Sequence, residues 1–490
     1  MQIFWLILGV VLLWPSSSEA ACTGSSPTWT AASASRTDVS DCVAAVSSGD
    51  RINVPPGSAT WDSAVDISGK DLTIIGAGSG SNTDINTVIT MTSGNCFTIG
   101  KGGTSSSSRI SRFRFVNCMI GLDGLNPGKP FHIDHNYFQS SVQRTMRVSG
   151  YNYPLPPRGL FDHNVHELTR FVIYGTMFML NEANWQHLIW ATDPDFGGPQ
   201  AVYIEDCIIT NGPPGTIDSN YGGRYVYRFN TVTVDTYAHE FHGVQSNNRA
   251  GQRWEIYGNS VTTTASSAWA SSFLRGATGF MFNNTRSGTW TNGAVLKVER
   301  SSEDKLVWGF CDGTKIIDGN TPGFRGWPCR DQIGRSRDSA IYSGSGAWPP
   351  QASTPAYSWN NTQGGSQWGF SGYKGNSIES TLHSLVNRDW FNYNAEFNGT
   401  TGVGIGMLST RPVSCTTGVA YWATDDGEWN SRHAGTDGQL YKCTATNTWT
   451  LYYTPYSYPH PLQATQGDST PPAAPINLTV KNPALPGGAF

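Results

Sequence analysis

One short pattern recurs six times in this chain and limits its possible folds more than any other feature. In each copy an apolar residue is followed three positions later by Asn, or in one copy by Cys. Successive copies lie 23 to 43 residues apart, a suitable length for one coil of a solenoid with insertions. Because the runs around them are short and β-rich, the pattern predicts an all-β fold built as a parallel β-helix. The apolar positions are Ile133, Phe161, Ile204, Tyr227, Ile256 and Met281, and the third positions after them are Asn136, Asn164, Cys207, Asn230, Asn259 and Asn284.

Stacking explains why such a pattern recurs. In parallel coils each residue lies about 4.8 Å from its counterpart in the next rung, so like residues form columns and must tolerate one another. Asn suits a column because its amide both donates and accepts hydrogen bonds. It also tolerates the left-handed conformation that a sharp turn needs. We therefore expect the apolar column to fill the interior and the Asn column to form a ladder at a turn.

The residue directly after each apolar position is expected to point outward and to carry little packing. Three carboxylates in successive rungs repel one another unless they share a proton, bind a cation such as calcium, or pair with a base such as arginine. A neighbouring outward column adds His132, Tyr203 and Glu255. Either these side chains form a site, or they are solvated charges on a sheet face. The first outward column is Asp134, Asp162, Glu205, Arg228, Tyr257 and Phe282.

A second group combines imidazole, guanidinium and carboxylate side chains within 17 residues, from His239 to Glu255. His242 is suited to general acid or base chemistry, because its unperturbed pKa lies near neutrality. The alternative is that His239 and His242 are turn residues bonded to the backbone. Four arginines would hold the carboxylates of an acidic glycan: Arg224, Arg228, Arg253 and Arg275.

The termini and the composition indicate an exported, soluble protein, extracellular or periplasmic. An apolar run from Ile3 to Trp14 ends in Ser-Glu-Ala before Ala21, which is typical of a secretory signal peptide. No other stretch approaches the ~20 apolar residues of a membrane helix. The net charge of −4 argues against a nucleic-acid partner, which would require a basic surface.

The pattern divides the chain into six parts. We expect a signal peptide at 1–20, an N-terminal cap at 21–60, the β-helix at 61–300, a loop-rich extension at 301–414, a small disulfide-stapled aromatic module at 415–465 and a flexible Pro-rich tail at 466–490. The aromatic side chains of the module would either stack on sugar rings or form the core of a small cap.

The nine cysteines of an exported chain predict disulfides. Three pairs are close in sequence and lie in loop-rich segments: Cys22 with Cys42, Cys311 with Cys329, and Cys415 with Cys443. Cys118 and Cys207 are placed at the Asn-ladder position of their rungs, and Cys96 has a similar context. These last three are expected to be buried free thiols, because no spacing resembles a zinc site.

Roughly residues 50–300 resemble the pectate-lyase-like superfamily of right-handed parallel β-helices. The resemblance is carried by Phe131-His132-Ile133-Asp134-His135-Asn136, which is similar to the Ile-Asp-His strand motif of pectate lyases. It implies that Asp134, Asp162 and Glu205 are calcium ligands and that Arg228 is the base that removes the proton beside a uronate carboxyl group.

Together these patterns predict a secreted monomer that cleaves an acidic polysaccharide by β-elimination, with calcium and no organic cofactor. The alternatives are a glycoside hydrolase on the same fold, whose carboxylates would lie one or two rungs apart, and a non-catalytic glycan-binding or adhesion protein. Fold alone does not choose among them. The predicted catalytic residues are Arg228, Glu205, His242, Asp162 and Arg253, and the predicted substrate-binding residues are Arg224, Tyr203, His239, Glu255 and Arg275.

Overall fold

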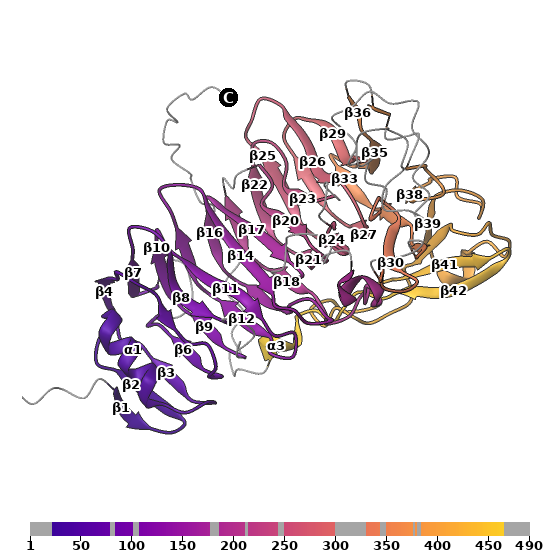
Figure 1. The fold of residues 1–490 in the computed structure, drawn as a ribbon. Helices are drawn as coiled ribbons and strands as arrows, with labels where there is room; N and C mark the ends of the chain where they lie inside the picture. The colour runs from indigo at the N-terminus through magenta and orange to yellow at the C-terminus, as the bar shows by residue number, and fades with distance from the viewer. Residues whose placement is uncertain are drawn as a thin grey trace, which may run out of the picture.

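The computed structural model describes residues 22–78, 84–100, 107–176, 186–210, 214–243, 249–298, 330–343, 349–375, 378–379 and 384–464. Within these ranges the chain circulates through three long sheets, and each circuit adds one strand to each sheet. The strands stack side by side from the indigo N-terminal end toward the orange and yellow C-terminal end (Figure 1). This all-β arrangement of large parallel sheets is compatible with the predicted parallel β-helix. Among the described residues, no helix has the length and apolar character needed to cross a membrane.

Sheet A has thirteen strands, all parallel except for the antiparallel first pair. In spatial order they are β1 (Cys22–Ser25), β2 (Thr28–Ala31), β3 (Arg51–Asn53), β6 (Thr73–Ile75), β9 (Arg109–Ser111), β12 (Phe131–Asp134), β15 (Gly159–Asp162), β18 (Val202–Glu205), β21 (Arg224–Arg228), β24 (Arg253–Tyr257), β27 (Thr278–Phe282), β32 (Ala356–Trp359) and β38 (Trp390–Asn392).

Sheet B follows sheet A in each circuit and has eleven strands. They are β4 (Gly57–Thr60), β7 (Thr87–Thr90), β10 (Phe113–Val116), β13 (Tyr137–Gln139), β16 (Val165–Glu167), β19 (Ile208–Thr210), β22 (Thr231–Val234), β25 (Ser260–Thr263), β28 (Thr285–Ser287), β33 (Asn361–Gln363) and the antiparallel β34 (Ser366–Trp368).

Sheet C completes each circuit with ten parallel strands. They are β5 (Val65–Asp66), β8 (Asn95–Ile99), β11 (Met119–Leu125), β14 (Arg144–Gly150), β17 (Thr169–Tyr174), β20 (Ile217–Asn220), β23 (His239–Phe241), β26 (Ala268–Leu274), β29 (Trp290–Leu296) and β35 (Phe370–Gly372).

The remaining elements lie outside the three sheets. The helix α1 (Arg36–Ala45) packs at the N-terminal end, where Ser35 accepts a hydrogen bond from the backbone of Asp38 and caps it. Two short antiparallel pairs are β30 (Arg335–Asp338) with β31 (Gln351–Ser353), and β36 (Lys374–Gly375) with β37 (Ile378–Glu379). A four-stranded sheet follows: β39 (Val403–Gly406), β40 (Ala420–Ala423), β41 (Gln439–Ala445) and β42 (Thr448–Tyr453). Short helical turns are η2 (Leu188–Ala191), η3 (Leu408–Thr410) and α3 (Pro461–Ala464).

The predicted Asn ladder is present at the turn from sheet A to sheet B. Asn136 donates to Asn164 over 3.1 Å, Asn230 to Asn259 over 3.0 Å and Asn259 to Asn284 over 2.9 Å. The ladder has one further member, because Asn284 donates to Asn361 over 2.8 Å. All six predicted apolar positions are fully buried. Alternation along the strands therefore placed the interior correctly.

Two details of the turn differ from the prediction. The left-handed residue is the one before each Asn, for example His135 at φ 55° and Phe229 at φ 56°, and the Asn itself points inward and bonds the backbone. Cys118 is not in the ladder, because it lies between β10 of sheet B and β11 of sheet C. The residue of that rung whose backbone bonds the ladder is Phe113, which donates to Asn136 over 3.0 Å.

The described residues contain three disulfides. Cys22–Cys42 and Cys415–Cys443 confirm two predicted pairs, and Cys311 and Cys329 lie outside the described residues. Cys96 and Cys118 were expected as free thiols, which is wrong: β8 and β11 are neighbouring strands, and this pairing brings the two Cα atoms to 5.7 Å, where they form a disulfide. Cys207 is a buried free thiol as predicted. Three disulfides are compatible with an extracellular protein.

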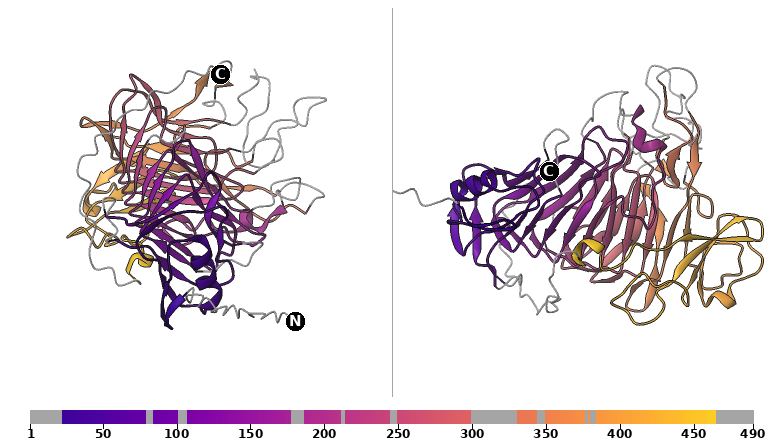
Figure 2. Two further views of the ribbon diagram at one scale, coloured as in Figure 1. Left: turned by 90° about the vertical axis from the view of Figure 1, so that its left-hand side faces the viewer. Right: turned by 90° about the horizontal axis from the view of Figure 1, so that it is seen from below.

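The C-terminal module differs in extent from the prediction, because its sheet begins at β39, before residue 415. Its aromatic side chains pack on the outer face of sheet A, where the rings of Tyr453 and Phe280 stack at 3.9 Å and Trp422 lies 5.0 Å from Trp359. From β42 the chain turns back along sheet A, and the yellow α3 lies beside strands near the middle of the stack (Figures 1 and 2). We call residues 454–464 the C-terminal segment.

A histidine is buried among aromatic side chains in the interior. His166 is fully buried with its ring stacked on Phe138 at 4.6 Å and edge-on to Phe171 at 4.8 Å. Neither ring nitrogen has a hydrogen-bond partner among the described residues. Burial lowers the pKa of His166 to about 3, so the ring is neutral inside the fold.

Replacing His166 by Phe is expected to stabilise the protein, and the gain should grow in acid. Below pH ~6.5 the unfolded chain protonates this histidine and the folded chain does not, so stability falls as the pH drops toward 3, by about 1.4 kcal/mol per unit. Phe removes both this loss and two unpaired polar atoms. Thermal midpoints at pH 7 and pH 5 measure the effect. Equal differences between variant and parent at the two pH values would contradict a neutral buried ring.

Candidate functional site

The outward acidic column of sheet A exists as predicted. The strand register pairs Asp134 with Asp162, Asp162 with Glu205, and Glu205 with Arg228. The same register continues through Tyr257, Phe282 and Trp359, and it places Leu160, Tyr203, Val226 and Glu255 in successive rungs of the neighbouring column. The prediction that these residues come together is thus met, and their surroundings decide what they can do.

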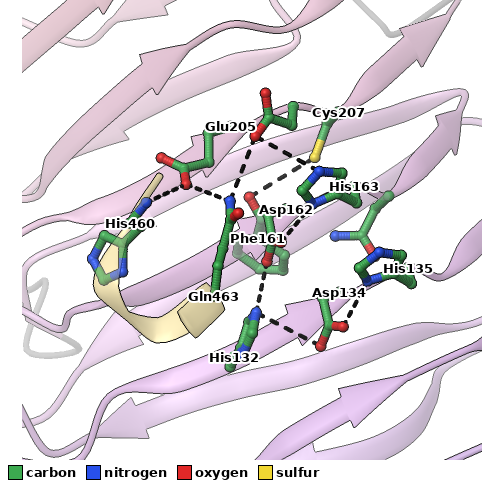
Figure 3. Close-up of polar contacts among 12 residues, drawn as sticks. His132, Asp134, His135, Phe161, Asp162, His163, Glu205, Cys207, His460 and Gln463 are labelled. Atoms are coloured by element: carbon green, nitrogen blue, oxygen red, sulfur yellow. Dashed lines mark hydrogen bonds and ion pairs between the residues drawn. The ribbon is translucent and has the colours of Figure 1, made fainter. Parts of the chain in front are cut away.

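Asp134 and Asp162 are each held by basic partners from the chain itself (Figure 3). Asp134 accepts from Arg109 over 2.6 and 2.7 Å and from Ser111 over 2.8 Å. Asp162 bonds His132 over 2.6 Å and His163 over 2.7 Å. Burial acts to raise the pKa of both carboxyl groups, but the charge of His132 and these hydrogen bonds outweigh it and hold both pKa values well below the usual range. Both groups are therefore ionised and paired.

Glu205 and Arg228 form an ion pair that is sealed beneath the C-terminal segment. Arg228 donates from Nε to Glu205 over 2.6 Å, and its other nitrogens donate to the backbone carbonyls of Tyr456 over 2.6 Å and Ser457 over 2.9 Å. Glu205 in turn accepts from the backbone of His460 over 2.9 Å and from Gln463 over 2.7 Å. Both side chains are fully buried. The prediction that they carry little packing is wrong, because the returning chain covers this part of the sheet.

Three further predicted residues are also covered. Arg224 donates to Gln252 over 2.9 Å and to Thr192 over 2.8 Å, beneath the loop that follows η2. Arg253 bonds the backbone carbonyl of Asp195 and pairs with Glu255 over 2.8 Å. Glu255 also accepts hydrogen bonds from the backbone N–H of Gly197 over 3.0 Å and from the hydroxyl of Tyr453 over 2.6 Å. None of the three is in contact with solvent.

The other two predicted substrate-binding residues of this group are also inaccessible. Tyr203 is fully buried, donates to the carbonyl of Gly198 over 2.8 Å and stacks beneath the guanidinium of Arg228 at 4.9 Å. His239 points into the interior from β23, with its ring 4.9 Å from Tyr227 and its Nδ1 3.0 Å from Ser272. It is a strand residue rather than the turn residue of the alternative interpretation.

Calcium does not fit the predicted set of Asp134, Asp162 and Glu205. Each carboxylate already has a cationic or hydrogen-bond-donating partner, so the negative charge that a calcium ion would neutralise is neutralised by the chain. Two groups among the described residues bring three potential ligand atoms within 4.8 Å of one another, and neither contains this trio. No step proposed below uses calcium.

The remaining predicted residues, His242 and Arg275, belong to a different face. Together with Arg170 of β17, Asp218 of β20 and Glu240 of β23 they form a group on the outer side of sheet C, which we call the sheet C cluster. Arg170 bridges the two acids, with Nη2 2.9 Å from Asp218 and 2.5 Å from Glu240. Arg275 bonds Glu240 over 2.5 Å and also contacts Nδ1 of His242. The same Nδ1 lies 3.2 Å from Asp218.

The pKa values of the two acids of the cluster are shifted in opposite directions. Burial raises the pKa of Glu240, and the neighbouring charge of Asp218 adds to this rise. Burial also acts on Asp218, but the hydrogen bond and the charge of His242, together with Arg170, outweigh it and lower its pKa. Asp218 is thus the ionised partner of His242. Pairs of titratable groups separated in this way are typical of acid–base sites.

Part of the sheet C cluster is exposed to solvent, whereas Glu205 and Arg228 of the sheet A column are fully buried. The side chains of Arg170 and His242 are 23% and 21% exposed, whereas those of Asp218 and Glu240 are only 8% and 7% exposed. The acids therefore lie behind the arginine and the histidine. The guanidinium of Arg170 and the imidazole of His242 are therefore the groups of the cluster that a ligand can reach most easily.

Aromatic side chains continue the same face of sheet C on both sides of the cluster. Toward the C-terminal end, Trp269 and Phe273 of β26 lie 4.9 Å apart, with Tyr237 6.1 Å from Trp269. At the C-terminal ends of β17 and β20, the strands that carry Arg170 and Asp218, Tyr174 lies 5.2 Å from Tyr221. Trp269, Phe273, Tyr237 and Tyr174 are all partly exposed. Rings that keep an open face next to charged groups suit the binding of a long, partly apolar polymer such as a glycan.

The sequence interpretation found His242 and Arg275 but missed Asp218 and Arg170 and did not assign Glu240 a role. The available signal was the alternation in Ile217-Asp218-Ser219-Asn220 and in His239-Glu240-Phe241, which places an acid on the outer face of two strands.

Comparison with known proteins adds no relative: no family model, no curated protein and no solved structure matches this chain.

Proposed function

We propose that this protein is a secreted enzyme with a right-handed parallel β-helix fold that cleaves a uronate-containing polysaccharide by β-elimination at the sheet C cluster. The observation that carries the proposal is the pairing of a partly exposed imidazole with a partly exposed guanidinium on the outer face of sheet C. β-Elimination needs a base for the proton beside the carboxyl group and a cation for the charge that then develops.

The cluster supplies these roles as follows. Arg170 binds the uronate carboxylate and stabilises the enolate-like charge. In the tautomer that this role requires, Nδ1–H of His242 donates to Asp218 and does not accept from Arg275, so Nε2 removes the proton beside the carboxyl group. The bond to the glycosidic oxygen then breaks, and the imidazolium, stabilised by Asp218, returns the proton to the leaving oxygen. Glu240 holds Arg170 and Arg275 in place through its two oxygens. The aromatic rings on either side hold the sugars before and after the cleaved bond.

A glycoside hydrolase is the second candidate, and the pair of Asp218 and Glu240 favours it. Their pKa values move apart, and the two carboxylates come within 4.8 Å, near the ~5–5.5 Å of retaining enzymes. We rank it below the lyase because Arg170 bridges both acids and separates them from solvent.

The test is incubation of the purified protein with a panel of uronate polymers, following ultraviolet absorbance of unsaturated ends and release of reducing ends in parallel. Both signals rising together support elimination, whereas reducing ends without absorbance indicate hydrolysis. Repeating the assay with EDTA shows whether any cation takes part. If no polymer yields either signal but one binds tightly, the protein is a glycan-binding protein.

The aromatic platform gives a separate prediction. Trp269→Ala is expected to raise KM for the polymer about tenfold, equivalent to about 1.4 kcal/mol of binding, while kcat changes less. Trp449→Ala is the matched control, because Trp449 is a partly buried tryptophan of the C-terminal module and stacks on Arg411 at 5.2 Å. A larger KM effect at Trp449 would move glycan binding to that module.

A further inference from the structure

A row of outward side chains runs from the sheet C cluster toward the C-terminal end of the stack. Its members are His242, Arg275, Lys297 and Tyr373, which directly follow the ends of β23, β26, β29 and β35, neighbouring strands of sheet C (Figure 1). The backbone N–H groups of Arg275, Lys297 and Tyr373 each donate to the rung before, over 2.9, 2.9 and 2.8 Å. The ladder thus extends to these positions, and successive members lie about 4.8 Å apart. We call the four residues the strand-end row.

Alternation places the strand-end row on the outer face of the sheet. Leu274 and Leu296, which precede Arg275 and Lys297, are buried in the hydrophobic core. Successive side chains of a strand point to opposite faces, so the row points away from that core. Lys297 therefore adds a further cation to the face that carries Arg275.

Two aromatic rings position the ammonium group of Lys297. Its Nζ lies 5.6 Å from the ring centroid of Phe273 and 5.7 Å from that of Tyr373. Tyr373 in turn lies 6.3 Å from Trp269. Both Nζ distances are within the ~6 Å range of cation–π attraction. Lys297 is only partly buried, and an ammonium group has three donor hydrogens, so it can bond an arriving anion while it stays beside the rings.

We propose that Lys297 binds a second carboxylate of the substrate, on a sugar that lies toward the C-terminal end of the stack from the cleaved one. The inference rests on the proposed function, because it takes His242 as the point of cleavage. Two rungs separate Lys297 from His242, about 10 Å along the stack, which is too far for the carboxylate of the sugar whose proton His242 removes. That carboxylate is assigned to Arg170, so the ammonium group of Lys297 meets a different sugar.

The direction and the charge of the substrate follow from this placement. A polymer that contacts both His242 and Lys297 runs across the strands, along the stack, and passes the rings of Trp269 and Phe273. Its carboxyl groups must be free and closely spaced, because an ester or an isolated uronate brings no second anion to the ammonium group. The substrate class is therefore a polyuronate with free carboxyl groups on nearby sugars.

The test is Lys297→Met, which keeps a side chain of similar volume and removes the charge. On polygalacturonate or alginate, whichever the parent cleaves, KM is expected to rise about tenfold, the effect of one charged hydrogen bond. The value of kcat should change by less than about twofold, because the chemical step does not use Lys297. Lys297→Arg should stay close to the parent. Higher ionic strength should shrink the difference between parent and Lys297→Met, and so should partial methyl esterification of the polymer.

Lys442→Met is the matched control, because Nζ of Lys442 also lies over a ring, 4.4 Å from the centroid of Tyr452, but in the C-terminal module. It should leave both constants unchanged. Calorimetric binding in the His242→Asn background, with and without Lys297→Met, separates this inference from the lyase proposal. Equal KM or equal affinity with and without Lys297→Met overturns the inference alone. Binding that depends on Lys297 without any cleavage by the parent supports the site and overturns the lyase, and no binding of either polymer overturns both.

Discussion

Replacing His242 by Asn is expected to lower kcat on the cleaved polymer by about 10²–10⁴-fold, because the variant loses the base for the proton beside the uronate carboxyl group. KM should change little, since Arg170 and the aromatic rings remain. Steady-state kinetics from the absorbance of unsaturated ends measure both constants.

The matched control is His433→Asn, the same substitution at an exposed histidine of the C-terminal module that is 59% exposed. It should keep full activity. If His242→Asn also keeps full activity while the parent cleaves the polymer, the sheet C cluster is not the catalytic site. An unchanged circular dichroism spectrum and thermal midpoint in both variants assign any loss to chemistry rather than to folding.

Replacing Arg228 by Ala is expected to destabilise the fold by about 3–5 kcal/mol, because Glu205 would remain as a buried and unpaired carboxylate. The guanidinium also joins sheet A to the backbone of Tyr456 and Ser457, so its loss removes these hydrogen bonds as well. Burial acts to lower the pKa of Arg228, but the charge of Glu205 and the hydrogen bond to Tyr257 outweigh it and raise the pKa, which keeps the group charged at any working pH. Urea unfolding measures the change in free energy.

Arg147→Ala is the control for this variant. Arg147 forms an ion pair of similar length with Asp123, at 2.7 Å, but the two side chains are 46% and 32% exposed. Exposed pairs contribute about 0–1 kcal/mol, so this variant should be close to the parent. Equal losses in the two variants would show that the pair of Arg228 and Glu205 is not sealed in solution. The double variant Arg228→Met with Glu205→Gln should recover part of the loss, since no charge is left without a partner.

The fold was largely predictable because a stacked chain repeats its constraints. An apolar residue such as Ile204 must point inward in every rung, and Asn259 must bond its neighbours in the ladder, so both show as a periodic signal. The last member of the ladder shows the limit of this signal. Asn361 was missed because the residue three positions before it is Ser358, and a pattern that requires an apolar residue there does not find it.

The site was harder to predict, because columns determine which residues are neighbours within a sheet but not what covers the sheet. Glu205 and Arg228 were correctly paired by register and then wrongly placed at an open surface, since the irregular segment that covers them has no periodicity to connect it with β18 and β21. The sheet C cluster was only partly found. The connections that follow β20 and β23 differ in length, at 221–223 and 242–252, and so Asp218, Glu240 and Arg275 do not share one sequence spacing.

The C-terminal segment also determines the order in which parts of the molecule can fold. Arg228 and Tyr456 are 228 positions apart along the chain, and Glu205 and Gln463 are 258 apart. Contacts between such distant residues form late, because closing a long loop costs entropy before it gains contacts. Rungs near the middle of the stack can therefore assemble while synthesis continues, but their buried ion pair stays uncovered until the C-terminal segment has emerged. Residues 454–464 thus complete a part of the structure whose strands were made more than 200 residues earlier.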